Sequence, residues 1–187
     1  MCGIFGYIGH RNAGKIAIDG LKKLEYRGYD SAGIAGLHNG KIYFNKVVGK
    51  VELLEKEYDL QGISLNPAIA HTRWATHGKP TVINAHPHFD STHSLAIVHN
   101  GIIENYRDLK QELIAKGAVF TSDTDTEAVV RLLSDYLDQG YSPQKAMMAT
   151  VETRPIWVWV HISISNPRKI HLARNGEARR YDDPFWL

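Results

Sequence analysis

The order of predicted elements along this 187-residue chain indicates an α+β protein built on antiparallel sheets. Short apolar runs predict strands in the first half, amphipathic stretches predict helices between residues 104 and 150, and apolar runs return after residue 155. The dipeptide Asn39-Gly40 between two of the runs is a strong signal for an antiparallel hairpin. A doubly wound parallel sheet would instead alternate strands with helices throughout.

The first half is predicted to be rich in strands. An apolar run between glycines predicts a buried strand at 3–9, after which the period changes and predicts an amphipathic helix at 12–25. Further strands are expected at 32–37 and 41–47, on either side of the hairpin turn, and at 68–70 and 94–99. A short helix is expected at 50–58.

The second half is predicted to contain helices and then two strands. One helix is expected over 104–116, ending at Gly117. The next begins at Thr124, which is expected to form a capping box with Glu127, and runs to Gly140. A third opens with Ser142-Pro143, a cap followed by proline. Strands at 156–165 and 169–173 follow.

Composition indicates a single soluble domain and excludes several classes of function. The chain is 43% hydrophobic with a formal net charge of +2, and no basic cluster suggests nucleic-acid binding. There is one cysteine, no apolar run of membrane-spanning length and no signal-peptide pattern. We therefore expect a cytoplasmic protein that binds neither nucleic acid nor membrane.

Cys2 is the only cysteine and follows the initiator methionine directly. Removal of Met1 would leave one residue with both a thiol and a free α-amine, and an α-amine of pKa near ~8 can act as base to its own side chain. The alternative is that Cys2 is a small buried apolar residue, as lone cysteines usually are.

Four residues in polar loops have chemistry that suits a substrate site. The guanidinium of Arg73 can clamp a carboxylate, and Asp125 can bind an ammonium group. The Asn100 side chain and the Gly101 amide can together donate two hydrogen bonds to an oxyanion. Taken singly, each is more often a solvated, turn or helix-capping residue.

Together, six motifs resemble those of a known family: CGI at 2–4, YRGYDSAG at 26–33, HTRWATHG at 71–78, NAHPH at 84–88, HNGIIEN at 99–105 and TDTE at 124–127. Their order and spacing resemble the glutaminase domain of glutamine–fructose-6-phosphate aminotransferases (glucosamine-6-phosphate synthases), which are class II, N-terminal-nucleophile amidotransferases. The resemblance implies a four-layer αββα sandwich of the N-terminal nucleophile hydrolase type over residues 1–187. It also implies hydrolysis of the glutamine side-chain amide through a Cys2 thioester, without a cofactor.

The resemblance further implies a role for each matching residue. Cys2 would be the nucleophile, with its α-amine as base, and the oxyanion would be held by Asn100 and Gly101. Arg27 and Gly28 would lie beside the nucleophile, orienting the amine and closing the site. The remaining implied residues bind L-glutamine: Arg73 at the α-carboxylate, Asp125 at the α-ammonium, and Thr76 and His77 along the same pocket.

Residues 151–187 match the family poorly, so we expect a divergent or incomplete tail and a sandwich truncated at its C-terminus. We expect no sugar isomerase domain within residues 1–187, and fructose 6-phosphate would be used only through such domains. Four large apolar residues in this tail are expected to lack complete packing partners: Trp157, Trp159, Phe185 and Trp186. A non-catalytic relic that keeps the glutamine pocket remains an alternative.

A histidine-rich metal module is a further alternative. It would use histidines that are concentrated in one part of the chain: His71, His77, His86, His88, His93 and His99. Pro87 interrupts the closest pair, and no cysteine or acidic partner recurs at ligand spacing. These histidines are therefore interpreted as mainly structural, with no metal site.

Overall fold

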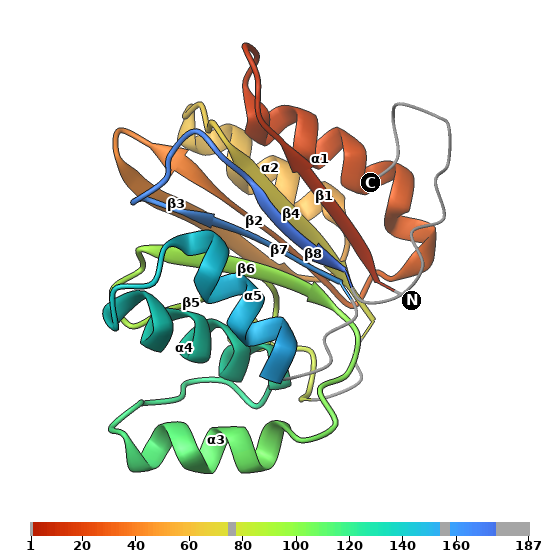
Figure 1. The fold of residues 1–187 in the computed structure, drawn as a ribbon. Coiled ribbons are helices and arrows are strands. Elements are labelled where there is room, and N and C mark those ends of the chain that lie inside the picture. Colours follow the sequence, from red (N-terminus) through yellow and green to blue (C-terminus); the bar gives the residue numbers. More distant parts are fainter. Residues whose placement is uncertain (1, 75–77, 154–157, 175–187) are drawn as a thin grey trace.

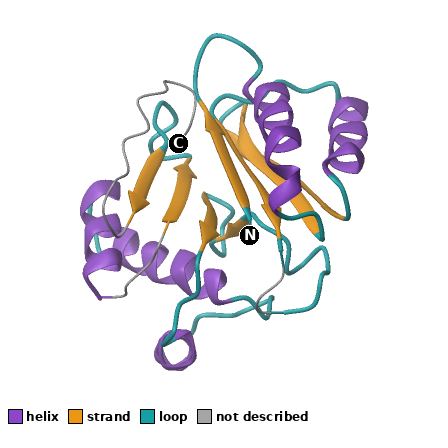
Figure 2. Cartoon of the chain, turned by 90° about the vertical axis from the view of Figure 1, so that its right-hand side faces the viewer, coloured by secondary structure: helices purple, strands orange, loops and turns teal. Residues whose placement is uncertain are grey.

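Two antiparallel sheets packed face to face form the centre of the protein, and helices cover the outer face of each sheet (Figure 1 and Figure 2). The computed structural model describes residues 2–74, 78–153 and 158–174. The layers follow the order helices, sheet, sheet, helices. This confirms the predicted α+β class and the αββα sandwich.

The first sheet has the strand order β1-β4-β2-β3, and all neighbouring strands are antiparallel. Its strands are β1 (Gly3–Tyr7), β4 (Ala68–Arg73), β2 (Ser31–His38) and β3 (Lys41–Val48). The turn between β2 and β3 places Asn39 at φ 50° and Gly40 at φ 75°. Two successive positive φ angles are what a tight hairpin turn requires, so the predicted hairpin is confirmed.

Helices α1 (Ala13–Leu24) and α2 (Val51–Gln61) cover the outer face of the first sheet. A single 3-10 turn, η1 (Glu25–Arg27), continues α1 toward the end of the sheet where β1 begins. The apolar face of α1 predicted from the sequence is buried, with Ala17 and Leu21 fully enclosed. Asn12 caps the helix, because its side chain accepts hydrogen bonds from the amides of Gly14 and Lys15.

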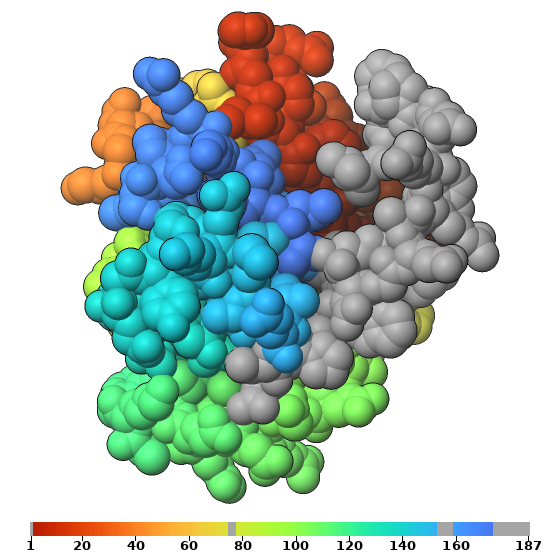
Figure 3. Space-filling view, viewed as in Figure 1, coloured from red at the N-terminus to blue at the C-terminus, as the bar shows by residue number. Residues whose placement is uncertain are grey.

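The second sheet has the strand order β5-β6-β7-β8. Its strands are β5 (His88–Phe89), β6 (Leu95–Asn100), β7 (Val158–Ser163) and β8 (His171–Arg174). Helices α4 (Asp125–Asp138) and α5 (Pro143–Thr153) pack on its outer face, and α3 (Tyr106–Ala115) packs against α4. In the space-filling view the green and cyan atoms of these helices form the lower part of the visible face, below the blue atoms of β7 and β8 (Figure 3).

The layer between the two sheets is made of small and β-branched side chains: Ala35, Ile69, Ala96, Val98, Val160 and Ile162. Because side chains alternate along a strand, β4 directs Ile69, His71 and Arg73 toward the second sheet. By the same alternation, β6 directs Val98 and Asn100 toward the first sheet. The polar residues at the ends of these two strands therefore meet where the apolar layer stops.

One sequence prediction about local structure is corrected, and one short strand was missed. The capping box at the start of α4 does not form, because the Glu127 carboxylate accepts hydrogen bonds from Thr121 and Ser122 and none from Thr124. Strand β5 was not predicted, since two residues are too few to show a period. The Ser142 cap of α5 is confirmed by a bond from the Lys145 amide to its hydroxyl.

The region predicted to be a divergent tail is partly ordered into the sandwich. Strand β7 pairs with β6 from Asn100–Val158 to Leu95–Ser163, and Trp159 is fully buried against the helices, contrary to the expectation of missing partners. Residues 154–157 and 175–187 lie outside the described residues, with Trp157, Phe185 and Trp186 among them. No helix within the described ranges is long and apolar enough to cross a membrane.

Candidate active site

A cavity of about 460 Å³ opens where the beginning of β1 and the ends of β4 and β6 meet. Six of the residues predicted for the site line this cavity: Cys2, Arg27, Arg73, Asn100, Gly101 and Asp125. Gly28 is buried next to Arg27 in the chain but does not line the cavity. Thr76 and His77 fall outside the described residues. The lining also includes residues to which the sequence analysis assigned no role in a glutamine site: Trp74, His86, His99, Ile102, Thr124 and Thr126.

Cys2 is held at the mouth of the cavity by strand pairing next to it. Gly3, the first residue of β1, donates its amide to the Thr72 hydroxyl at 3.2 Å. A Cβ at Gly3 would lie 2.8 Å from both Leu24 and Thr72, so only glycine fits at the position after Cys2. The Cys2 sulfur accepts a hydrogen bond from the Trp74 amide at 3.2 Å.

Burial raises the pKa of the Cys2 thiol, and the hydrogen bond from Trp74 only partly offsets that effect. Cys2 is therefore a thiol rather than a thiolate at neutral pH in this environment. A thiol needs a base to take its proton before it can act as a nucleophile.

Asn100, at the end of a strand of the second sheet, contacts Cys2. Its Nδ2 donates to the carbonyl oxygen of Cys2 at 3.3 Å, and its Oδ1 lies 2.9 Å from Nε2 of His71. The same Nε2 lies 3.1 Å from the carbonyl oxygen of His99. Both neighbours are acceptors, so His71 carries its proton on Nε2 and fixes the orientation of the Asn100 amide.

The role of His71 was not predicted from the sequence. Its presence in the HTRWATHG motif was the only signal, because the contact joins two different sheets. Gly101, next to Asn100, has φ 142°, a backbone conformation that residues other than glycine rarely adopt. The backbone amide after Asn100 thus belongs to a residue whose conformation favours glycine, and its role in an oxyanion hole stays a prediction.

Two buried groups of opposite charge line the same cavity. Arg73, only 4% exposed, donates from Nη2 to the Gly78 carbonyl at 2.9 Å and from Nη1 to that of Lys79 at 3.4 Å. Asp125, 6% exposed, is the first residue of α4 and accepts the Ile103 amide at 2.8 Å. A buried cation and a buried anion beside a thiol suit a small zwitterion better than an apolar ligand.

Most histidines near the cavity are buried and neutral. The rings of His71 and His86 stack with centroids 4.1 Å apart, and His86 meets His88 edge-on at 4.7 Å. Burial lowers the pKa of His71 to about 3 and that of His99 to about 4, and it lowers the pKa values of His86 and His88 well below 6.5. Across the described ranges, no three His, Cys, Asp or Glu side chains are grouped to hold a metal ion.

These buried histidines predict an acid-sensitive fold. Their folded-state pKa values lie below the ordinary value of 6.5, so the unfolded chain takes up protons first as pH falls. Stability is complete above about pH 6.5 and is lost toward pH 4 and 3, by roughly 1 kcal/mol per pH unit for each histidine. Urea midpoints measured between pH 7.5 and 5 should fall steeply.

His161 offers a control for this prediction. Burial lowers its pKa to about 3, it stacks on His171, and neither of its ring nitrogens has a hydrogen-bond partner among the described residues. His161→Phe should therefore fold and show a shallower pH dependence than the unaltered chain. Midpoints that do not change with pH in the unaltered chain would contradict the prediction.

Comparison with known proteins agrees with this geometry. The model of the glutamine amidotransferase domain family matches residues 51–152. Glutamine–fructose-6-phosphate aminotransferase (isomerising) of Pyrococcus horikoshii is 46% identical over 175 residues, which cover 93% of this chain and 29% of that protein. The enzyme of the same name from Chlamydia trachomatis is 56% identical over 134 residues, covering 72% and 22%. The chain thus spans about a quarter of the length of these relatives.

Solved structures show the same fold. Glutamine phosphoribosylpyrophosphate amidotransferase from B. subtilis superposes with a TM-score of 0.73 at 26% identity, covering 86% of this chain and 35% of that one. A glutamine aminotransferase class-II domain protein from Silicibacter pomeroyi reaches a TM-score of 0.59 at 13% identity, covering 96% and 79%. The family model, the relatives and the shared sandwich agree. This chain belongs to the glutamine amidotransferase domain family.

Proposed function

We propose that this chain hydrolyses the side-chain amide of L-glutamine to glutamate and ammonia. The observation that carries the proposal is one cavity that holds the Cys2 thiol, the Asn100 amide, and the buried charges of Arg73 and Asp125. Glutamine has a matching set of groups: a reactive amide at one end, and an α-carboxylate and an α-ammonium at the other. Membership of the amidotransferase family supports the same substrate.

The reaction proceeds through a thioester. After removal of Met1, the α-amine of Cys2 takes the thiol proton while sulfur attacks the amide carbon. Asn100 Nδ2 and the Gly101 amide stabilise the resulting oxyanion. The C–N bond breaks, the leaving nitrogen receives the proton, and ammonia departs. Water, deprotonated by the same amine, then cleaves the thioester to give glutamate.

The amino-acid end of glutamine is held by charge. Arg73 binds the α-carboxylate as a planar fork, and Asp125 accepts hydrogen bonds from the α-ammonium. Arg27, which lines the cavity, would orient the amine in this proposal, and Gly28 next to it in the chain would help to close the site. Thr76 and His77 complete the pocket in this proposal.

The chain supplies the ammonia-producing part of a larger activity in this proposal, as residues 1–187 form a glutaminase domain. Its relatives are named for glutamine–fructose-6-phosphate aminotransfer, and most of their length has no counterpart here. Fructose 6-phosphate would be used by such additional domains and not by this cavity. A reducing cytoplasm suits a mechanism that depends on one free thiol.

An assay of the processed protein tests the proposal. Intact mass first establishes that Met1 is gone, and the protein is then incubated with L-glutamine, with and without fructose 6-phosphate. We expect glutamate and ammonia in equal amounts, the same products with the sugar phosphate, and no effect of a chelator. Protein that retains Met1 should be inactive. Absence of glutamate from processed protein would favour the non-catalytic alternative, and glucosamine 6-phosphate would show a sugar site that we do not place in this chain.

A further inference from the structure

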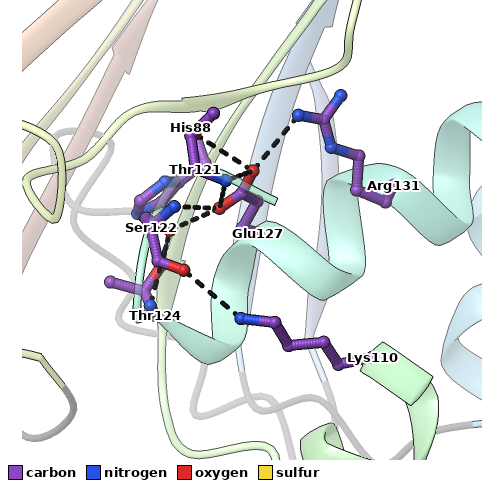
Figure 4. Close-up of polar contacts among 7 residues, drawn as sticks. All are labelled: His88, Lys110, Thr121, Ser122, Thr124, Glu127 and Arg131. Atoms are coloured by element: carbon purple, nitrogen blue, oxygen red, sulfur yellow. Dashed lines mark hydrogen bonds and ion pairs between the residues drawn. The ribbon is translucent and has the colours of Figure 1, made fainter. Parts of the chain in front are cut away.

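Glu127 is a buried carboxylate whose hydrogen bonds all lead to the segment just before α4 or to the next turn of that helix (Figure 4). It is 2% exposed. It accepts the amides of Thr121 at 2.9 and 3.1 Å and of Ser122 at 2.6 Å, and the hydroxyls of the same residues at 3.2 and 2.6 Å. Arg131 Nη2 adds an ion pair at 3.1 Å. A buried carboxylate with this many donors is stable only as the anion.

The charge of Glu127 sets the direction of a chain of hydrogen bonds. Burial opposes ionisation, but the bonds from Ser122, Thr121 and Arg131 outweigh it and lower the pKa of Glu127. The Ser122 hydroxyl donates to the carboxylate, so at 2.9 Å it accepts from the Thr124 hydroxyl. Thr124 in turn accepts from Nε2 of His88 at 3.0 Å. One ionised group therefore orders three side chains beside the cavity.

The segment 121–124, ordered in this way, leads directly into Asp125 and also contacts the loop that follows Arg73. Asp125 follows Thr124 directly and lines the cavity. On the other side, the Asp123 amide donates to Asn84 Oδ1 at 2.9 Å, and Asn84 Nδ2 donates to the Lys79 carbonyl at 3.1 Å. The Lys79 carbonyl is one of the two carbonyls that accept hydrogen bonds from the Arg73 guanidinium. Displacing residues 121–124 would move the proposed ammonium site first.

A purely helix-capping role does not account for this arrangement. A glutamate three residues after the N-cap normally bonds the N-cap amide, yet no side chain caps α4 in this way. The Glu127 carboxylate instead accepts hydrogen bonds from Ser122 and Thr121, which lie two and three residues before the N-cap. Resting on the glutaminase function proposed above, we propose that Glu127 is a positioning residue that holds Asp125 in place and so makes the site selective for substrates with an α-ammonium group.

The test compares L-glutamine with glutaramate, the analogue that lacks the α-amino group. For the unaltered protein, the ratio of kcat/KM for glutamine to that for glutaramate measures recognition of the ammonium. Glu127→Gln keeps the shape but puts an NH₂ where an acceptor is needed. It should lower the ratio about tenfold or more, through a higher KM for glutamine with a smaller change in kcat.

Arg131→Met is the matched control, because it removes the ion pair and none of the donors from residues 121 and 122. It should leave the ratio close to that of the unaltered protein. Thermal midpoints of both variants separate stability from selectivity. A Glu127→Gln protein that melts earlier but keeps the ratio would overturn the proposal, and so would an equal loss of the ratio in both variants.

Binding measurements distinguish a failure of the Glu127 proposal from a failure of the proposed glutaminase function. Calorimetric titration of the same proteins with glutamine and glutaramate measures the discrimination without turnover. If the unaltered protein binds glutamine selectively but does not hydrolyse it, the catalytic proposal fails, and the loss of binding selectivity in Glu127→Gln still decides the role of Glu127. If the unaltered protein does not distinguish the two ligands, the positioning role is wrong.

Discussion

Replacing Cys2 by alanine is expected to reduce glutamate release to background, a loss on the order of 10⁶-fold in kcat by analogy with other enzymes that lose their nucleophile. The physical reason is that no other described group in the cavity lining forms the covalent intermediate, since Cys2 is the only cysteine. The measurement is initial-rate glutamate production on protein whose Met1 has been removed.

The Cys2→Ala protein also supplies its own control. Alanine keeps the α-amine and leaves Arg73 and Asp125 unaltered, so glutamine should still bind. Acid-quenched intact mass of the unaltered protein should show a glutamyl adduct during turnover, and the alanine variant should show none. Undiminished turnover without the thiol would mean that the mechanism proceeds without a Cys2 thioester.

The next largest effect is expected at Asn100. Asn100→Ala removes one of the two proposed oxyanion donors, and losing one such donor typically costs about 10²–10³-fold in kcat. KM should change little, because Asn100 does not contact the amino-acid end of the substrate in the proposed pose. Steady-state kinetics with glutamine measure both constants.

Arg73→Ala is the contrasting variant. Losing the carboxylate clamp should chiefly raise KM, since that contact is made equally in the ground state and the transition state. Melting curves of both variants check that the fold is intact. A mainly kcat effect at Arg73 together with a mainly KM effect at Asn100 would show that the two ends of the pocket have been exchanged.

Much of the fold was predictable because its signals are local. The Asn39-Gly40 turn, the apolar face of α1 and the Ser142-Pro143 helix start are each encoded within a few neighbouring residues. The capping box failed for the same reason. Its sequence pattern is local, whereas the donors of Thr121 and Ser122 that compete for Glu127 become available only once the segment folds back on α4.

Six of the predicted site residues do line one cavity, but the contacts among them could not be predicted from the sequence. Cys2, Arg73 and Asn100 were identified from their chemistry and the motifs around them. The bond between His71 and Asn100 joins residues of different sheets, and no period or spacing in the sequence encodes it. The two roles assigned to His71 and Glu127 therefore required the structure.

The thin apolar layer between the sheets has a consequence for partly folded forms of the protein. Cys2 precedes a strand of one sheet and Asn100 ends a strand of the other, so each sheet alone contributes only part of the catalytic arrangement. A loosened state in which both sheets keep their hydrogen bonds but slide apart would retain a native circular dichroism spectrum in the far ultraviolet. This state would nevertheless be inactive as an enzyme. The rate of turnover is therefore a more sensitive measure of sheet docking than the secondary-structure content.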